Sequence, residues 1–257
     1  MSRILSIGMQ GPEVGNWQRF LNSALGKSLV VDEDFGPATR DATTAYQTKE
    51  NLVVGGGTIT GTLDPLTRKL ALVQGFIPYV QARNFGPLLP EFGKPGSRTV
   101  SLIVIHTMEA PDKPDTAENV AAWFSGPDAP RASAHYCVDN DSVVQCVRER
   151  DVAWHAQGAN SNGIGIEHAG YAKETDADWQ SPYNQGMLTL SAKLAARIAK
   201  EHGIAVEHRT VDELRSKIPG FCGHIDVNNA FNQGAGHVDP GPHFPWDQYL
   251  RLVQANI

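Results

Sequence analysis

The sequence is poor in cysteine and contains neither a long apolar run nor a block of basic residues. Three cysteines among 257 residues, at irregular spacing, make a poor disulfide framework, so we expect free thiols. Cys137 and Cys146 flank a turn-rich stretch and could lie close together on a hairpin. No segment approaches the roughly 18 continuous apolar residues of a membrane span, and the amino terminus lacks the apolar core of a signal peptide. We therefore expect synthesis and retention in the cytoplasm until something else releases the protein.

The charge balance excludes a further class of partner. Asp and Glu outnumber Lys and Arg by 28 to 22, which gives a net charge of -6, and the basic residues are dispersed along the chain. Binding to a phosphate backbone requires clustered basic residues, so nucleic acid is not an expected partner. With 41% hydrophobic residues, a chain of this length can bury the cores of one or two domains, and we expect a monomer.

The first 76 residues predict a small all-α module of three helices. Val14 and Trp17 begin an apolar series at helical spacing. Two further helices are predicted to begin at Pro37 and Pro65, because proline suits the first turn of a helix. The chain then becomes rich in glycine and proline, which predicts a linker over residues 77–97.

Residues 98–257 predict an α/β domain. The run 100–105 is continuously apolar and rich in β-branched residues, as in a strand buried on both faces. A hairpin is predicted within 134–147, another strand over 163–168, and a long amphipathic helix over 187–198. The mixture of helices and buried strands indicates the fold class, whereas the order of the strands cannot be read from the pattern.

Two histidines and an aspartate supply the ligands of a hydrolytic metal site. His106 ends the first buried strand, where open α/β sheets present functional side chains, and His224 and Asp239 lie among glycines and prolines that form loops. Two imidazoles and one carboxylate can hold Zn²⁺ and leave a fourth position for water, whose pKa zinc lowers to roughly 7. The inventory therefore predicts one Zn²⁺ ion and metal-assisted hydrolysis. Cys222 is a weaker candidate ligand, and the alternative interpretation is that these are unrelated core and loop residues.

Two more residues are candidate catalytic groups. Strand alternation places Glu167 and Gly165 on one face and His168 on the other, so His168 is expected to be packed in the core. We expect the glycine to leave room for a substrate beside Glu167, the candidate general base. His237 precedes Asp239 by two residues, and as an imidazolium it could stabilise an oxyanion or protonate a leaving amine. Alternatively, His237 is itself a ligand, and Glu167 is an exposed strand carboxylate without a catalytic role.

Other polar residues near these motifs are weaker candidates. Asp226 could cap a turn or orient the neighbouring histidine ligand. Trp154 and His155 precede the strand that carries the candidate base, which makes them candidate substrate-binding residues in the wall of a cleft. His135, on the predicted hairpin, is expected to be packed, and His243 is expected in an outer loop.

A second set of motif residues lies in the predicted helical module. They are Gly11, Val14, Gln18, Leu21, the segment Asp34-Phe35-Gly36-Pro37, Thr39, Tyr46, Gln47, Gly61, Leu63, Asp64 and Thr67. In these residues the module resembles the peptidoglycan-binding type 1 module, which is a three-helix bundle. The resemblance covers nearly all of residues 5–73 and implies binding to the cell-wall polymer. Most of the matching residues are expected to be core and capping residues, so they support the fold more directly than they support ligand binding.

Seven motifs follow one another along residues 98–247. They are Ile103-Val-Ile-His106-Thr107, Trp123-Phe124, Ser133-Ala-His-Tyr136, Ala153-Trp-His-Ala156, Ile164-Gly-Ile-Glu167, Gly223-His224-x-Asp226 and Asp239-Pro-Gly-Pro-x-Phe-Pro-Trp246. In these motifs the segment resembles the zinc-dependent N-acetylmuramoyl-L-alanine amidase type 2 family, whose peptidoglycan-recognition-protein fold implies a central mixed sheet flanked by helices. By this resemblance the metal ligands are His106, His224 and Asp239, and the catalytic glutamate is Glu167. Many members have a lysine at the position of His237, and an imidazole must be protonated to supply that cation.

This resemblance implies hydrolysis of the amide between N-acetylmuramic acid and L-alanine in peptidoglycan. Glu167 would deprotonate the attacking water, His237 would help to stabilise the oxyanion, and the helical module would hold the enzyme on the polymer. Together with the expected lack of an export signal, the arrangement resembles a phage endolysin that acts on the cell wall after holin-type release. The alternatives are a bacterial enzyme that recycles muropeptides, a non-catalytic peptidoglycan receptor, and a zinc peptidase that cuts elsewhere in the stem peptide.

Overall fold

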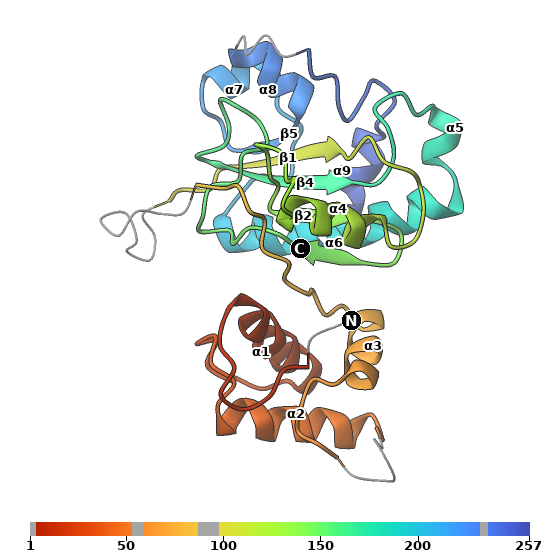
Figure 1. Cartoon of the computed structure of the whole chain (residues 1–257). Coiled ribbons are helices and arrows are strands. Elements are labelled where there is room, and N and C mark those ends of the chain that lie inside the picture. The colour runs from red at the N-terminus through yellow and green to blue at the C-terminus, as the bar shows by residue number, and fades with distance from the viewer. Residues whose placement is uncertain (1–3, 53–58, 87–97, 232–235) are drawn as a thin grey trace. The chain divides into compact units, whose positions relative to one another are not determined.

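A computed structural model of the chain describes residues 4–52, 59–86, 98–231 and 236–257 (Figure 1). The chain divides into two compact units, Met1–Tyr79 and Val80–Ile257. In the described part, no helix combines the length and the apolar character needed to cross a membrane.

The first unit contains the three predicted helices, α1 (Pro12–Leu25), α2 (Pro37–Lys49) and α3 (Pro65–Val73). Each helix has proline in its first turn, where the missing N–H leaves no hydrogen bond unmade. Trp17 lies at the centre of the core and packs edge-on against Tyr46, with ring centroids 5.7 Å apart. The sequence prediction of a small all-α module is therefore confirmed.

Two glutamines fix the turns before α2 and α3. Gln18 donates from Nε2 to the Asp34 carbonyl and to Thr39 Oγ1, both at 2.9 Å. In the same way, Gln47 donates from Nε2 to Thr67 Oγ1 at 2.9 Å, and its Oε1 accepts the N–H of Gly61 at 2.9 Å. These residues carry the resemblance of this unit to a known module, and here their observed contacts are structural.

The second unit is built on a mixed sheet of five strands in the order β3-β2-β4-β1-β5. The strands are β1 (Leu102–Thr107), β2 (Tyr136–Val138), β3 (Val143–Gln145), β4 (Gly163–His168) and β5 (Gly220–Gly223). β1 runs parallel to β4 and β5, β2 runs parallel to β4, and β2 and β3 form the predicted antiparallel hairpin. The three central strands therefore end at the same edge of the sheet.

Helices cover both faces of this sheet, which confirms the predicted α/β class. Val104 and Cys222 pack with α8 on one face, whereas Phe221 and His168 contact Tyr249 of α9 on the other. The long helix α6 also lies on this second face, where Ser191 Oγ is 2.6 Å from His168 Nε2. The helices of this unit are α4 (Thr116–Ser125), α5 (Asp176–Trp179), α6 (Pro182–His202), α7 (Val211–Arg215), α8 (His224–Phe231) and α9 (Trp246–Gln254).

Residues 80–86, which belong to the predicted linker, form backbone hydrogen bonds with the rest of this unit. Val80 and Ala82 donate backbone hydrogen bonds to the carbonyls of Gln145 and Cys146, both at 2.9 Å. Gly86 then exchanges two backbone hydrogen bonds with Val152. Residues 87–97 of the predicted linker lie outside the described residues.

Candidate metal and catalytic site

The carboxyl-terminal edge of the sheet places two candidate residues side by side. His106 on β1 and Glu167 on β4 are register partners in the parallel pair. Because paired residues of neighbouring strands project to the same face, the imidazole and the carboxylate share one side of the sheet. His168, one residue further along β4, is buried on the opposite face, as expected from strand alternation.

The other two candidate ligands come from segments that are tied to each other. His224 is the first residue of α8 and follows β5 directly, and Ile225 donates its N–H to the carbonyl of Asp239 at 3.0 Å. Asp226 accepts the N–H of Gly223 on Oδ2 at 2.7 Å, so it caps the turn that presents His224, one of its two expected roles.

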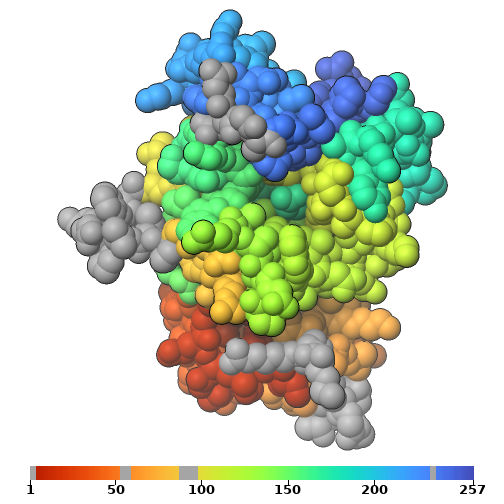
Figure 2. Space-filling model, turned by 45° about the horizontal axis from the view of Figure 1, so that its top comes forward, coloured from red at the N-terminus to blue at the C-terminus, as the bar shows by residue number. Residues whose placement is uncertain are grey.

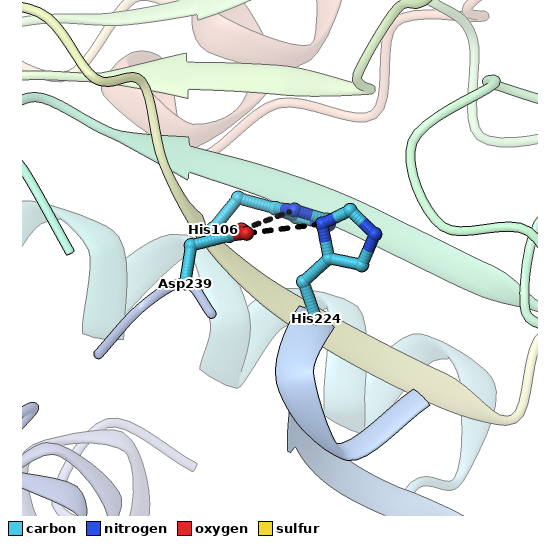
Figure 3. A group of neighbouring side chains, drawn as sticks. All are labelled: His106, His224 and Asp239. Atoms are coloured by element: carbon cyan, nitrogen blue, oxygen red, sulfur yellow. Dashed lines mark hydrogen bonds and ion pairs between the residues drawn. The ribbon is translucent and has the colours of Figure 1, made fainter. Parts of the chain in front are cut away.

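His106, His224 and Asp239 converge on one point. Asp239 Oδ2 is 3.0 Å from His106 Nδ1, and Asp239 Oδ1 is 3.2 Å from His224 Nδ1. One ligand atom from each residue lies within 4.8 Å of the other two. Figure 3 shows both rings directed toward the carboxylate. In the described part of the chain this is the one group of three such side chains that could hold a metal ion, and all three are buried.

His155 lies behind His106 and orients it. Its Nδ1 is 3.1 Å from His106 Nε2, and its own Nε2 is 3.3 Å from the carbonyl of Gly163. If His106 serves as a metal ligand, a proton on each Nε2 satisfies both contacts and leaves the lone pair of His106 Nδ1 for the ion; this tautomer is inferred from the network. A histidine ligand whose second nitrogen is held in this way is typical of metal sites.

The space beside Gly165 is not open to substrate, which corrects the sequence-based expectation. A Cβ atom at Gly165 would lie 2.6 Å from Cγ of His155. The glycine is therefore required for the imidazole of His155 to lie against the strand. His155 is buried, so its contacts support an orienting role, whereas its predicted contact with substrate stays a prediction.

The charges around the cluster are strongly coupled. Burial alone would raise the pKa of Asp239, but its hydrogen bonds with His106 and His224 hold that pKa well below the usual range. Burial lowers the pKa of His106, which favours the neutral imidazole that can act as a ligand. Burial, together with the charges of Asp239 and Glu109, raises the pKa of Glu167 well above its ordinary value. Its Oε2 is buried and has no hydrogen-bond partner in the described part of the structure.

These residues fit a Zn²⁺ ion. Two imidazole nitrogens and one carboxylate oxygen are a donor set that zinc takes in hydrolytic sites, and the orientation of His106 by His155 is independent of any ion. His237 lies at the rim, with Nδ1 3.8 Å from Asp239 Oδ1 and half of its side chain exposed. Cys222, the weaker candidate ligand, is buried among apolar residues and is not part of the group of converging ligands.

Three further candidates are placed outside the cluster. Trp154 is 39% exposed, so its indole remains available to a ligand. His135 is fully buried and accepts the N–H of Gly165 on Nδ1 at 3.0 Å, as expected for a packed residue. His243 is in an outer loop and pairs with Asp176 at 2.9 Å.

One residue near the site was not identified from the sequence. Glu109 follows β1 with a positive φ of 52°, an uncommon conformation outside glycine. Its Oε1 accepts the hydroxyl of Thr107 at 2.9 Å and the N–H of Ala172 at 2.7 Å, so it joins the loops that follow β1 and β4. A carboxylate two residues after a strand is too common a pattern to have indicated this role.

The sequence profile of the N-acetylmuramoyl-L-alanine amidase family matches residues 96–242, which is more than half of the chain and includes all three converging ligands. The chain belongs to this family. It is therefore an N-acetylmuramoyl-L-alanine amidase by enzyme class, and peptidoglycan is the substrate of that class.

Similarity to individual amidases supports this assignment. N-acetylmuramoyl-L-alanine amidase A of Achromobacter lyticus is 31% identical over 170 residues, which span 61% of this chain and 85% of that protein. The 1,6-anhydro-N-acetylmuramyl-L-alanine amidase AmpD of Haemophilus influenzae is 27% identical over 187 residues, or 64% and 89% of the two chains. The solved structure of the Staphylococcus aureus hydrolase AmiA with its ligand superposes with a TM-score of 0.52 at 15% identity over 84% and 89% of the two chains, which supports the amidase fold.

Proposed function

We propose that this amidase is zinc-dependent, that His106, His224 and Asp239 hold one Zn²⁺ ion, and that Glu167 is the general base. The observation that carries the proposal is the convergence of three ligand atoms beside a carboxylate oxygen without a partner. An unpartnered carboxylate is costly to bury, and groups of this kind concentrate at catalytic sites.

The residues divide the chemistry between them. When bound, Zn²⁺ would activate water and polarise the lactyl carbonyl of N-acetylmuramic acid. Glu167 takes a proton from the attacking water, whose oxygen bonds to the carbonyl carbon. The bond from that carbon to the L-alanine nitrogen then breaks, and Glu167 returns the proton to the nitrogen. Because its pKa is raised, Glu167 holds the proton readily between these steps. His237, at the rim, would stabilise the negative charge on the carbonyl oxygen.

The helical module would hold the enzyme on its substrate. We assign residues 1–76 to a peptidoglycan-binding module, residues 77–97 to a linker and residues 98–257 to the catalytic domain. The three-helix fold of the first unit and its motif resemblance support this assignment, and tethering to an insoluble polymer raises the effective concentration of scissile bonds. A monomeric endolysin, released to the cell wall from the cytoplasm, is the biological role that this combination favours.

Digestion of purified peptidoglycan tests the reaction and the metal together. We expect the wild-type protein to release peptides with a free L-alanine amino group, a chelator to abolish the release, and added Zn²⁺ to restore it. Mass analysis distinguishes the alternatives, since a stem-peptidase exposes a different amino group and a receptor exposes none. Turnover that persists after complete removal of metal contradicts zinc dependence.

A matched pair of variants tests the ligand set. Asp239→Ala should lose bound zinc and activity together, because the carboxylate contacts both histidines. Asp212→Ala removes a carboxylate that is 89% exposed on α7 and should leave both zinc content and turnover unchanged. A fully active, zinc-loaded Asp239→Ala protein would refute the assignment of this residue as a ligand.

A further inference from the structure

Oxygen atoms gather at the edge of the second unit where the chain that follows β1 meets the chain that follows β4. Ala110 and Gly170 exchange two backbone hydrogen bonds there, at 2.8 and 3.3 Å. Asp112 lies two residues after Ala110, and Glu174 lies four residues after Gly170. Figure 2 shows the yellow-green chain after β1 and the teal chain around α5 side by side at this edge. The pairing therefore brings together two carboxyl groups from distant parts of the sequence.

The two carboxyl groups lie close to each other although both can carry a negative charge. A Cβ atom at Gly170 would lie 2.2 Å from Glu174 Oε1 and 2.9 Å from Asp112 Oδ1. The other oxygens of the same carboxyls, Oε2 and Oδ2, lie 3.2 and 3.3 Å from Nδ2 of Asn184. Burial and the negative charges of Asp112 and Asp178 raise the pKa of Glu174 to about 7. The protein therefore leaves the negative charge of this pair poorly compensated.

Asn184 is the residue that points to a ligand. It lies in the first turn of α6, is fully buried, and directs its amide at both carboxyls. Nδ2 has three oxygen neighbours for its two hydrogens, because the carbonyl of Asp178 is also 2.9 Å away. Oδ1 is buried and has no hydrogen-bond partner in the described part of the structure. An unpartnered buried acceptor is costly, so these contacts do not satisfy the amide.

Rotation of this amide by half a turn gives the cluster the ligands of a calcium ion. The oxygen and nitrogen of an asparagine amide have nearly the same shape, so either atom can face the carboxyls. With Oδ1 of Asn184 in that position, it joins the Asp178 carbonyl and one oxygen from each carboxyl around one point. Ca²⁺ takes about six to eight oxygen ligands from carboxylates, amide and main-chain carbonyls, and water. Because Asp112 is exposed, water can supply the remaining ligands.

We propose that this cluster binds one Ca²⁺ ion. The site contains no imidazole or thiolate, which zinc prefers, and it shares no residue with the candidate zinc cluster. The ion neutralises the two carboxylates and joins the chain after β1, the chain after β4 and the start of α6. It therefore stabilises the second unit and takes no part in hydrolysis. Its protein ligands are the carboxylates of Asp112 and Glu174, the amide oxygen of Asn184 and the carbonyl oxygen of Asp178.

Calorimetric titration of the full-length protein with CaCl₂ tests the proposal. At about pH 8 both carboxyls are ionised, since the raised pKa of Glu174 is about 7. Two carboxylates are few for a calcium site, so we expect one ion to bind with a Kd of about 0.1–1 mM. At about 10 mM Ca²⁺ the thermal midpoint of unfolding of the second unit should rise by about 3 °C or more. NaCl at the same ionic strength should leave the midpoint unchanged.

A pair of double variants with equal changes in net charge locates the ion. Asp112→Asn/Glu174→Gln removes both charges and keeps the size of each side chain. We expect its Kd for Ca²⁺ to rise about tenfold or more, and the calcium-dependent rise in the midpoint to disappear. Glu201→Gln/Asp212→Asn changes two exposed carboxylates elsewhere and should bind Ca²⁺ as wild type does. If Asp112→Asn/Glu174→Gln does not fold, Asp112→Asn alone, at an exposed position, should still weaken binding.

Three results would overturn the calcium site. The first is the absence of saturable Ca²⁺ binding to the wild type, and the second is an equal Kd in the wild type and Asp112→Asn/Glu174→Gln. The third is a shared proton in place of the ion, seen as a calcium-independent change in stability near pH 7 that disappears in Glu174→Gln. Binding and unfolding are measured without turnover, so a failure of zinc-dependent hydrolysis would not alter this test.

Discussion

The imidazole rings of His224 and His237 stack face to face, with centroids 4.1 Å apart and planes inclined by 19°. His224 belongs to the buried cluster of candidate ligands, whereas half of the His237 side chain is exposed. The stacking holds the His237 ring beside the cluster without burying it. The ring is therefore oriented and partly exposed, which is what the proposed stabilisation of an oxyanion requires.

His237→Ala should therefore lower kcat without removing the metal. We expect a loss of about 10- to 100-fold, which is at or below the usual contribution of a positioned acid. His237→Lys should recover part of the activity, because lysine supplies a permanent cation at this position. Steady-state kinetics and zinc content measure the two effects separately. If His237→Ala loses zinc in proportion to activity, then His237 is a ligand and the catalytic role is wrong.

Glu167→Gln should separate metal binding from chemistry. The amide keeps the size of the side chain but cannot take a proton from water, so we expect kcat to fall by about 10²- to 10⁴-fold with zinc content unchanged. Because burial raises the pKa of this carboxyl, replacement by a neutral amide should not lower the thermal midpoint of unfolding at pH 7. A variant with wild-type turnover would exclude Glu167 as the general base.

Gly165→Ala should weaken metal binding although Gly165 touches no ligand. The added methyl group would lie 2.6 Å from the His155 ring, which must then move away from His106 Nε2. Loss of such a supporting contact typically costs about 10- to 100-fold in metal affinity. Titration with a competing chelator measures this affinity, and Gly126→Ala, where the nearest atoms lie at 3.4 Å, is the control. Wild-type zinc affinity in Gly165→Ala would show that His155 does not orient His106.

The candidate site residues on strands and in motifs were predictable because their signals are local. The apolar run of β1 ends at His106, and strand alternation puts Glu167 and His168 on opposite faces, which the structure confirms for His168. The proline starts of the three amino-terminal helices follow from the conformation of proline itself. For such features, neighbouring residues determine the structure.

Contacts between distant segments were not predictable in the same way. The sequence contains a glycine at position 165, but it does not show that the ring of His155, ten residues earlier, fills the space beside that glycine. Glu109 joins two loops through Thr107 and Ala172, and no spacing in the sequence marks that contact.

Glu149 makes the stability of the second unit depend on pH through contacts with residues outside the candidate site. Burial alone would raise the pKa of Glu149, but its contacts with His202, Arg197 and Tyr136 hold that pKa well below the ordinary 4.5. Its Oε1 is 2.6 Å from Arg197 Nη2, and its Oε2 is 3.2 Å from His202 Nε2. The carboxylate is thus stabilised in the folded state and not in the unfolded state.

The sign of the pH effect follows from this difference. A carboxyl group whose pKa is lower in the folded state contributes its full stabilisation above pH 4.5, and this contribution declines as the pH falls below that value. Glu149→Gln should therefore have a lower free energy of unfolding than wild type at pH 7, by on the order of 2 kcal/mol, because the partners of the carboxylate lose their hydrogen bonds. This difference in free energy should become smaller as the pH falls from 5 to about 3. Urea unfolding of both proteins at several pH values measures this difference. Glu201→Gln, which removes a half-exposed partner of the same arginine, should show a much smaller gap. Parallel stability curves for wild type and Glu149→Gln across this pH range would show that Glu149 does not carry the effect.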